Sequence, residues 1–260
     1  MSAVLPLICR MAEGTTIDEV WGHAVTFYAD IGFSRMNYGH TRFFHQSNVG
    51  DPDDAIFLTT GDANYERFFF HNGFYTRTPI YRWALTHSGA CTWKWVNDAY
   101  EAGKLTPEES DAVRQNAAHG VTAGISVSFP ESSTRSKGAL GLIADPGIGH
   151  DQVDAIWKTR QHEILAVAHA MHLKIITLPQ HAAKRSLTER QRQALEWVAD
   201  GKTTQDVAIL MGVSAAMVEK HLRLAREALQ VETTAQAVAK ASLLNLIFPP
   251  VVKSHRVGNS

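Results

Sequence analysis

Two short amphipathic segments meet at a glycine between residues 207 and 229. The first carries apolar residues on one helical face, namely Val207, Ala208, Leu210 and Met211. Gly212 interrupts this pattern, and Ser214 is placed to cap a second helix over residues 215–229. In that second helix Met217, Val218, Leu222 and Ala225 are expected to point inward, and Lys220, Arg223 and Arg226 outward. The pattern predicts a helix-turn-helix that presents a cationic face to DNA.

Helical periodicity continues on both sides of this pair. We expect helices over residues 189–199, 204–211, 215–229 and 234–246, which together form an all-α four-helix domain at residues 186–248. The apolar segment before this domain ends at Pro179, and residues 177–185 are expected to form a linker. Residues 249–260 are expected to form a tail.

Residues 1–176 mix helical and strand-like patterns. Apolar spacing predicts helices within residues 17–31, 63–79, 106–120 and 150–176. Strands are predicted within residues 34–44, 55–61, 90–96, 121–130 and 138–145, the last two as neighbours. The order favours a sheet covered by helices on both faces, so the whole chain is expected to be an α+β protein of two domains.

The composition is that of an ordinary globular protein, with 45% hydrophobic and 20% charged residues among 260. No apolar run reaches the roughly 18 residues that a membrane span needs, and no basic region precedes the short apolar run at the N-terminus. Cys9 and Cys91 have no metal-binding spacing. We therefore expect a cytoplasmic protein with no membrane partner.

The formal net charge of −1 conceals an asymmetry between the two parts of the chain. Residues 1–183 carry 14 Lys and Arg against 19 Asp and Glu, whereas residues 184–260 carry 11 against 7. A basic C-terminal part on an acidic body favours an anionic partner for the C-terminal domain.

The C-terminal run "LTERQRQALEWVADGKTTQDVAILMGVSAAMVEKHLRLAREALQV" resembles the DNA-binding domain of the LuxR family of bacterial regulators. The matching positions are Leu187, Thr188, Arg190, Leu195, Gly201, Ala208, Leu210, Val213, Ser214, Val218, His221, Leu229, Val231, Ala237 and Val238. Two positions depart from the family: Gln191 replaces a usual Glu, and Thr234 replaces a usual Arg. These departures are expected to alter phosphate contacts or internal hydrogen bonds and to leave the fold intact.

The resemblance implies that residues 215–229 form the recognition helix in the major groove. Glu219, Lys220 and Arg223 would then face base edges, because Lys donates to guanine and Glu accepts from cytosine. Phosphate contacts are expected from Lys202, Thr203, Thr204 and Arg226. The alternative is that these charges form only a solvated helix face. His221 is expected to be packed and hydrogen-bonded.

The front part is similar to the autoinducer-binding domain of the same family, which senses N-acyl homoserine lactones. The resemblance is carried by "IGFSRMNYG", by Pro79 with Trp93 fourteen residues on, by Gly120 in "AAHGVTAGISVSFP", and by "KGALGLIAD". It implies an α/β/α sandwich with a ligand-sensing site between the sheet and one helical layer.

The usual ligand contacts of that family are largely replaced here. Tyr65 stands where a Trp donates to the lactone carbonyl, and Phe69 where a Tyr reaches the amide carbonyl. Thr78 stands where an Asp accepts from the amide N–H, and Gly141 where a Ser or Thr is often found. Trp93 is kept as a wall of the pocket. The lost contacts predict weak or absent binding of ordinary acyl homoserine lactones.

Asn37 falls where an apolar residue is expected and is predicted to point into the site. The pocket wall is expected to include Tyr38, Tyr65, Phe69, Tyr81 and Trp93. The resulting hypothesis is a signal that is less amide-like or more aromatic. A pocket filled by its own side chains, with no ligand, is the alternative.

Enzymatic interpretations have little support in the residues. Ser126 in "GISVS" lacks the glycine that a nucleophile elbow requires two residues later. His162, His169 and His172 share a helical spacing, but no carboxylate or cysteine is placed with them. We expect no catalytic residues, no metal site and no cofactor.

These observations predict a ligand-responsive LuxR-type transcriptional regulator that binds a roughly palindromic operator as a homodimer. The final helix is apolar at Ala237, Ala241 and Leu244, which makes this face a candidate for the dimer contact. One alternative is a ligand-independent DNA-binding protein whose front domain serves dimerisation or protein interaction. Another is a redox or metal sensor that uses Cys91 or the late histidines.

Overall fold

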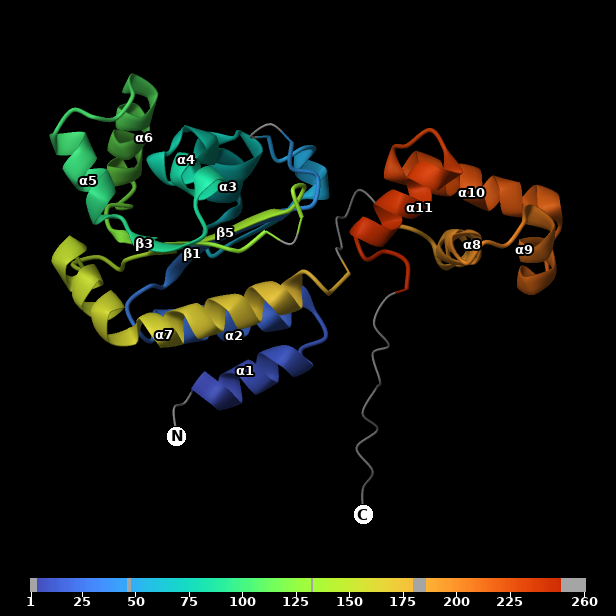
Figure 1. Cartoon of the computed structure of the whole chain (residues 1–260), viewed down its shortest axis with the longest axis horizontal. Helices are drawn as coiled ribbons and strands as arrows, with labels where there is room; N and C mark the ends of the chain where they lie inside the picture. Colours follow the sequence, from blue (N-terminus) through green and yellow to red (C-terminus); the bar gives the residue numbers. More distant parts are fainter. Residues whose placement is uncertain (1–3, 46–47, 132, 180–185, 249–260) are drawn as a thin grey trace, which may run out of the picture. The chain divides into compact units, whose positions relative to one another are not determined.

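The computed structural model describes residues 4–45, 48–131, 133–179 and 186–248. The chain divides into two compact units, Met1–Ile176 and Thr177–Ser260 (Figure 1). Most of the expected linker and all of the expected tail, residues 180–185 and 249–260, lie outside the described residues. No described helix is long and apolar enough to cross a membrane.

A five-stranded antiparallel sheet forms the centre of the first unit. Its order is β2 (Ile56–Thr59), β1 (Arg35–Thr41), β5 (Lys137–Ile143), β4 (Gly124–Ser128) and β3 (Gly89–Thr92). The register places one residue of each strand in a single row across the sheet, namely Thr59, Asn37, Gly141, Ser126 and Cys91. Directly paired residues point to the same face, so this row lies on one side of the sheet.

Helices cover both faces of the sheet (Figure 1). On one face lie α1 (Val4–Glu13), α2 (Ile17–Ala29) and α7 (His150–Ile175). On the other lie α3 (Ala63–Glu66), α4 (Pro79–Thr86), α5 (Lys94–Glu101) and α6 (Pro107–Ala118), with the short turns η1 (Pro52–Asp54), η2 (Arg67–His71) and η3 (Phe74–Arg77). The α/β/α sandwich expected from the sequence is confirmed.

Three local expectations in this unit were wrong. The strand predicted over residues 90–96 ends at Thr92, because Trp93 adopts a turn conformation from which α5 begins. The helix predicted over residues 63–79 is three short segments, because Gly73 has a φ of 71° that ends the second of them. Helix α1, which packs on α2 and α7, was not predicted.

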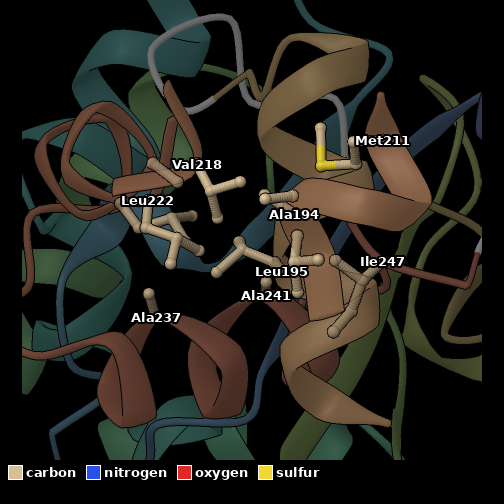
Figure 2. Packing of buried hydrophobic residues seen from close by; sticks show 12 residues of the cluster. Ala194, Leu195, Met211, Val218, Leu222, Ala237, Ala241 and Ile247 are labelled. Atoms are coloured by element: carbon tan, nitrogen blue, oxygen red, sulfur yellow. The ribbon is translucent and has the colours of Figure 1, made fainter. Parts of the chain in front are cut away.

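The second unit consists of four helices joined by capped turns. They are α8 (Glu189–Ala199), α9 (Thr204–Met211), α10 (Ala215–Leu229) and α11 (Thr234–Leu243). Each N-cap is a hydroxyl residue that accepts from the helix's first turn, as Ser214 does from the Met217 N–H. Figure 2 shows the core that the helices share, with Leu195, Val218 and Leu222 packed beside two alanines of α11.

The core differs from the sequence pattern on two helices. Leu210 and Met217 were expected to be buried, but they are 49% and 39% exposed, because Val207 and Val218 take the inward positions. Helix α11 ends at Leu243, three residues before the predicted end. Its Ala237 and Ala241 are fully buried within the unit, so the expected dimer contact through this face is wrong.

This packing predicts unequal costs for two leucine truncations. Leu222→Ala removes a buried side chain from the shared core and should lower the free energy of unfolding of the second unit by about 2–5 kcal/mol. Leu210→Ala, the matched control on an exposed position, should change it by about 0.5 kcal/mol or less. Urea unfolding of the full chain, followed by hydrogen exchange of the α8–α11 peptides, measures both. Equal costs would contradict the assigned core.

Candidate functional site

A cavity of about 330 Å³ lies between the sheet and the layer formed by α3–α6. Its volume is within the range of small-molecule sites. Aromatic side chains contribute much of its lining, namely Phe44, Phe57, Tyr65, Phe69, Phe70, Tyr75, Tyr81, Trp93 and Tyr100. No Asp or Glu is among the described lining residues, so the cavity is apolar with a few neutral polar groups.

Seven of the eight residues predicted to form the ligand site line this cavity. They are Asn37, Tyr65, Phe69, Thr78, Tyr81, Trp93 and Gly141. Several lining residues were not predicted, including Tyr75, Tyr100, Asn97 and Asn116, whose positions depend on how η3, α5 and α6 fold over the sheet. Phe57 was also missed, although alternation along β2 places it on the cavity face. Ser126 was considered only as a nucleophile, although strand alternation places it on the cavity face.

Tyr38 is the exception, and its assignment to the pocket was wrong. Successive residues of a strand point to opposite faces, so Asn37 faces the cavity while Tyr38 points toward α7. Its side chain is fully buried, and its hydroxyl lies 2.9 Å from Nδ1 of His172. Burial, followed by the charges of His40, His169 and Arg42, lowers the pKa of His172 to about 3. Burial also raises the pKa of the Tyr38 phenol, so both partners of this buried hydrogen bond are uncharged at neutral pH.

The groups proposed for metal or redox sensing have little chemical support. His162 is exposed and His172 is buried against Tyr38, and the described residues contain no cluster of three His, Cys, Asp or Glu that could hold a metal ion. Burial raises the pKa of the Cys91 thiol to about 11, which suppresses the reactive thiolate.

Asn37 occupies the centre of a short hydrogen-bonded chain in the cavity wall. Its Oδ1 accepts from the Thr59 hydroxyl at 2.7 Å, and its Nδ2 donates to the Tyr65 hydroxyl at 2.8 Å. The Tyr65 ring stacks on Phe69, with centroids 5.4 Å apart. Burial raises the pKa of Tyr65, so its proton stays available for donation.

The hydroxyl of Thr78 is committed to local backbone structure. It donates to the Tyr75 carbonyl at 2.8 Å and accepts from the Tyr81 N–H at 3.2 Å, which caps α4. The Trp93 indole is also engaged, because it donates to Ser126 at 2.9 Å. Gly141 leaves room for a Cβ, which would meet the Asn37 carbonyl at 3.8 Å and the Trp93 ring at 3.9 Å in ordinary contact.

In the second unit, the residues predicted to contact DNA lie on or beside α10. Lys202, Thr203, Glu219, Lys220 and Arg223 are exposed. Their partners are Asp206 for Thr203, Glu227 for Arg223 at 2.5 Å, and Thr204 for Glu219 at 2.8 Å. Arg226 is half-buried, and its guanidinium donates to the Thr234 hydroxyl at 2.9 Å, linking α10 to α11.

The two positions that depart from the LuxR pattern therefore both form internal hydrogen bonds. Thr234 accepts from Arg226. The buried Gln191 completes the capping box of α8, where its Oε1 accepts from the Thr188 N–H at 2.8 Å.

Comparison with known proteins assigns a family to both parts of the chain. Residues 16–175 match the autoinducer binding domain model, and residues 181–229 match the model of sigma-70, region 4. The chain belongs to the LuxR-type regulators with an autoinducer binding domain. It is a DNA-binding regulator of transcription with a ligand-binding domain in front of a helix-turn-helix.

The matches with named relatives cover most of the length of each relative. The transcriptional activator protein LuxR of Aliivibrio fischeri is 22% identical over 205 residues, which cover 78% of this chain and 79% of the relative. Escherichia coli SdiA has a similar fold, with a TM-score of 0.52, 16% identity and coverage of 95% of this chain and 98% of its own. A structure of SdiA in complex with octanoyl-rac-glycerol has a TM-score of 0.50, 16% identity and 94% coverage of both chains.

The position of Tyr38 predicts a stability effect that is separate from ligand binding. Tyr38→Phe leaves Nδ1 of His172 without its partner and should lower the free energy of unfolding by about 1–3 kcal/mol. Tyr100→Phe, which alters a half-exposed tyrosine, should have little effect and serves as the control. Thermal unfolding of the full chain measures both. A Tyr38→Phe protein of wild-type stability would show that this buried hydrogen bond contributes nothing.

Proposed function

We propose that this regulator responds to a small molecule other than an ordinary N-acyl homoserine lactone. The observation that carries the proposal is which side chains occupy the three positions that hydrogen-bond the amide linkage in the family. Thr78 has its hydroxyl committed to the α4 cap, Phe69 has no hydroxyl, and Gly141 has no side chain. An amide N–H buried at this place finds no carboxylate acceptor, and the Thr78 oxygen already accepts from the Tyr81 N–H, so the amide hydrogen bond is weakened or lost at a cost in affinity.

The cavity itself supports a ligand-responsive protein over the ligand-independent alternative. A space of about 330 Å³ lined by aromatic and neutral polar groups is the kind of concave, mostly apolar site that binds small molecules. SdiA is a relative in fold that has been obtained with an amide-free ligand, octanoyl-rac-glycerol. An ester or ketone signal is consistent with the groups that line the present cavity.

For the second unit, we propose that α10 enters the major groove of a roughly palindromic operator, one helix from each subunit of a homodimer. Lys220 and Arg223 are exposed on α10 and can donate to guanine, while Glu219 can accept from cytosine. Lys202, Thr203 and Thr204 lie where α9 begins and are assigned to phosphates. The partly buried Arg226 is assigned to a phosphate beside the end of α10.

Ligand would act by changing the population of dimers whose recognition helices have the spacing of the operator. A ligand can shift such an equilibrium only by its differential affinity for the two states. This mechanism requires the cavity of the first unit to be occupied in the dimer that binds DNA most tightly.

Restoring the missing polar groups should restore lactone binding. In the double variant Thr78→Asp, Phe69→Tyr, the aspartate offers an acceptor to the amide and still caps α4, because Asp is as good an N-cap as Thr. We expect N-octanoyl homoserine lactone to bind this variant at least tenfold more tightly than the wild type, by isothermal titration calorimetry. Phe57→Tyr, a hydroxyl added elsewhere on the wall, is the control. Tight lactone binding by the wild type would refute the proposed signal class.

Truncating the exposed cations of α10 should weaken sequence recognition and leave the fold intact. Lys220→Ala and Arg223→Ala should each reduce operator affinity by about 1–3 kcal/mol and relax the preference at one base pair. Lys158→Ala, an equal charge change on the first unit, is the control. Fluorescence anisotropy with operator and scrambled DNA measures the effect. Undiminished operator affinity would contradict the role of α10.

A further inference from the structure

The hydrogen bonds around Asn37 have a defined direction. The Thr59 hydroxyl accepts a hydrogen bond from the Gly61 N–H at 3.0 Å and donates one to Oδ1 of Asn37. The Asn37 amide nitrogen then donates to the Tyr65 oxygen at 2.8 Å. Because that oxygen already accepts a hydrogen bond, the Tyr65 proton is left to donate to another group, and Tyr65 lines the cavity.

A second chain of hydrogen bonds ends in the same way on the other side of Gly141. The Trp93 indole N–H can only donate, so Oγ of Ser126 is the acceptor in their 2.9 Å contact. The Ser126 proton is therefore available for another acceptor. Ser126 is 2% exposed to bulk solvent and lines the cavity.

The register places Asn37, which donates to Tyr65, and Ser126 on either side of Gly141. Asn37 and Ser126 are both paired with Gly141, one from each neighbouring strand, and strands lie about 4.8 Å apart. A Cβ at Gly141 would have the Asn37 carbonyl at 3.8 Å and the Trp93 ring at 3.9 Å as its nearest neighbours. Gly141 therefore leaves room for a small group, in ordinary contact with the Trp93 ring, between Ser126 and the Asn37 that positions Tyr65.

The charged groups near the cavity do not favour an ionised ligand. Lys137 is the described lining residue with an ammonium group, and its Nζ is paired with Glu131 at 2.7 Å. No carboxylate lines the described cavity to receive a cation. A bound molecule is thus selected by neutral hydrogen bonds and by contact with aromatic rings.

Building on the proposed function, we infer that the signal is a neutral ketone or ester that presents acceptor oxygens to Tyr65 and Ser126 over Gly141. Each chain of hydrogen bonds ends in a hydroxyl group, of Tyr65 or Ser126, that can donate into the cavity. A carbonyl or ester oxygen satisfies them, whereas an amide adds an N–H, and the Ser126 and Asn37 oxygens already accept from Trp93 and Thr59. Thr59 and Asn37 are positioning residues, because they set the direction in which Tyr65 donates.

A pair of probes that differ in one group tests this inference on the full-length protein. N-octanoyl homoserine lactone is compared with the octanoate ester of α-hydroxy-γ-butyrolactone, in which an ester oxygen replaces the amide N–H. We expect the wild type to bind the ester at least tenfold more tightly by isothermal titration calorimetry, because an unpaired buried donor costs about one order of magnitude in affinity or more.

Two variants change the hydrogen bonds that run from Thr59 through Asn37 to Tyr65. One reverses their direction and the other removes the donor that orients Asn37. In Asn37→Asp the carboxylate accepts the Tyr65 proton, so Tyr65 turns an acceptor toward the cavity and the preference should shift toward the amide. Thr59→Val, which introduces no buried charge, removes the proton that orients Asn37 and should reduce the ester preference. Thr159→Val makes the same change at an exposed position of α7 outside the cavity lining and should leave the ratio of the two affinities unchanged.

The outcomes separate this inference from the proposed function. If the wild type binds the amide tightly, and as tightly as the ester, both the assignment of an acceptor ligand and the proposed signal class are overturned. If the ester preference is the same in Asn37→Asp, Thr59→Val and Tyr65→Phe, the role of the hydrogen-bonded chain is overturned. If neither probe binds, the assignment to a ketone or ester is overturned, while the proposal of a signal other than an acyl homoserine lactone stands.

Discussion

Successive side chains of strand β1 point to opposite faces of the sheet, and the structure of the first unit depends on this alternation. One strand near the middle of the sheet supplies both the wall of the cavity and the core beneath α7. Asn37 and Gly39 line the cavity, while Met36 and Tyr38 are fully buried. A shift of register by one residue would exchange these two sets, placing Asn37 in the core and Tyr38 in the cavity.

The buried side of this strand is tied to α7 by polar as well as apolar contacts. Tyr38 reaches His172, and the His172 ring stacks on Phe129 with centroids 4.0 Å apart. His40 joins the same cluster, and burial lowers its pKa to about 4. The cluster therefore remains uncharged at neutral pH and behaves as part of the core. This rigid layer supports the sheet on which the cavity is built.

An element can be predicted from the sequence when the residues that determine it are neighbours in the chain. The boundaries of α8, α9 and α10 follow from hydroxyl caps, from Gly212 at a φ of 65° and from apolar spacing, all of which act within a few residues. The order of the strands and the opposite roles of Asn37 and Tyr38 depend on pairing between distant segments. The family resemblance identified seven positions of the cavity, which lie around Pro79 and Trp93 or on the cavity face of the central strands.

What sequence reasoning missed has specific physical causes. Leu210 and Met217 have apolar side chains on helices with more apolar residues than their buried faces can hold. The early end of α11 follows from Leu244, whose side chain is buried while its backbone leaves the helix. The commitment of the Thr78 hydroxyl depends on η3, whose short turn brings the Tyr75 carbonyl within reach.

The contact between Thr204 and Glu219 has a consequence for how the protein searches DNA. A carboxylate on the helix proposed to enter the groove is repelled by phosphates, so it weakens binding at every site that offers it no partner. The Thr204 hydroxyl holds this carboxylate in place before DNA is met, which reduces the side-chain entropy lost on docking. In the proposed binding mode, the restrained negative charge would shorten the time spent on wrong sequences and lower the overall affinity, so that the protein would leave such sites sooner.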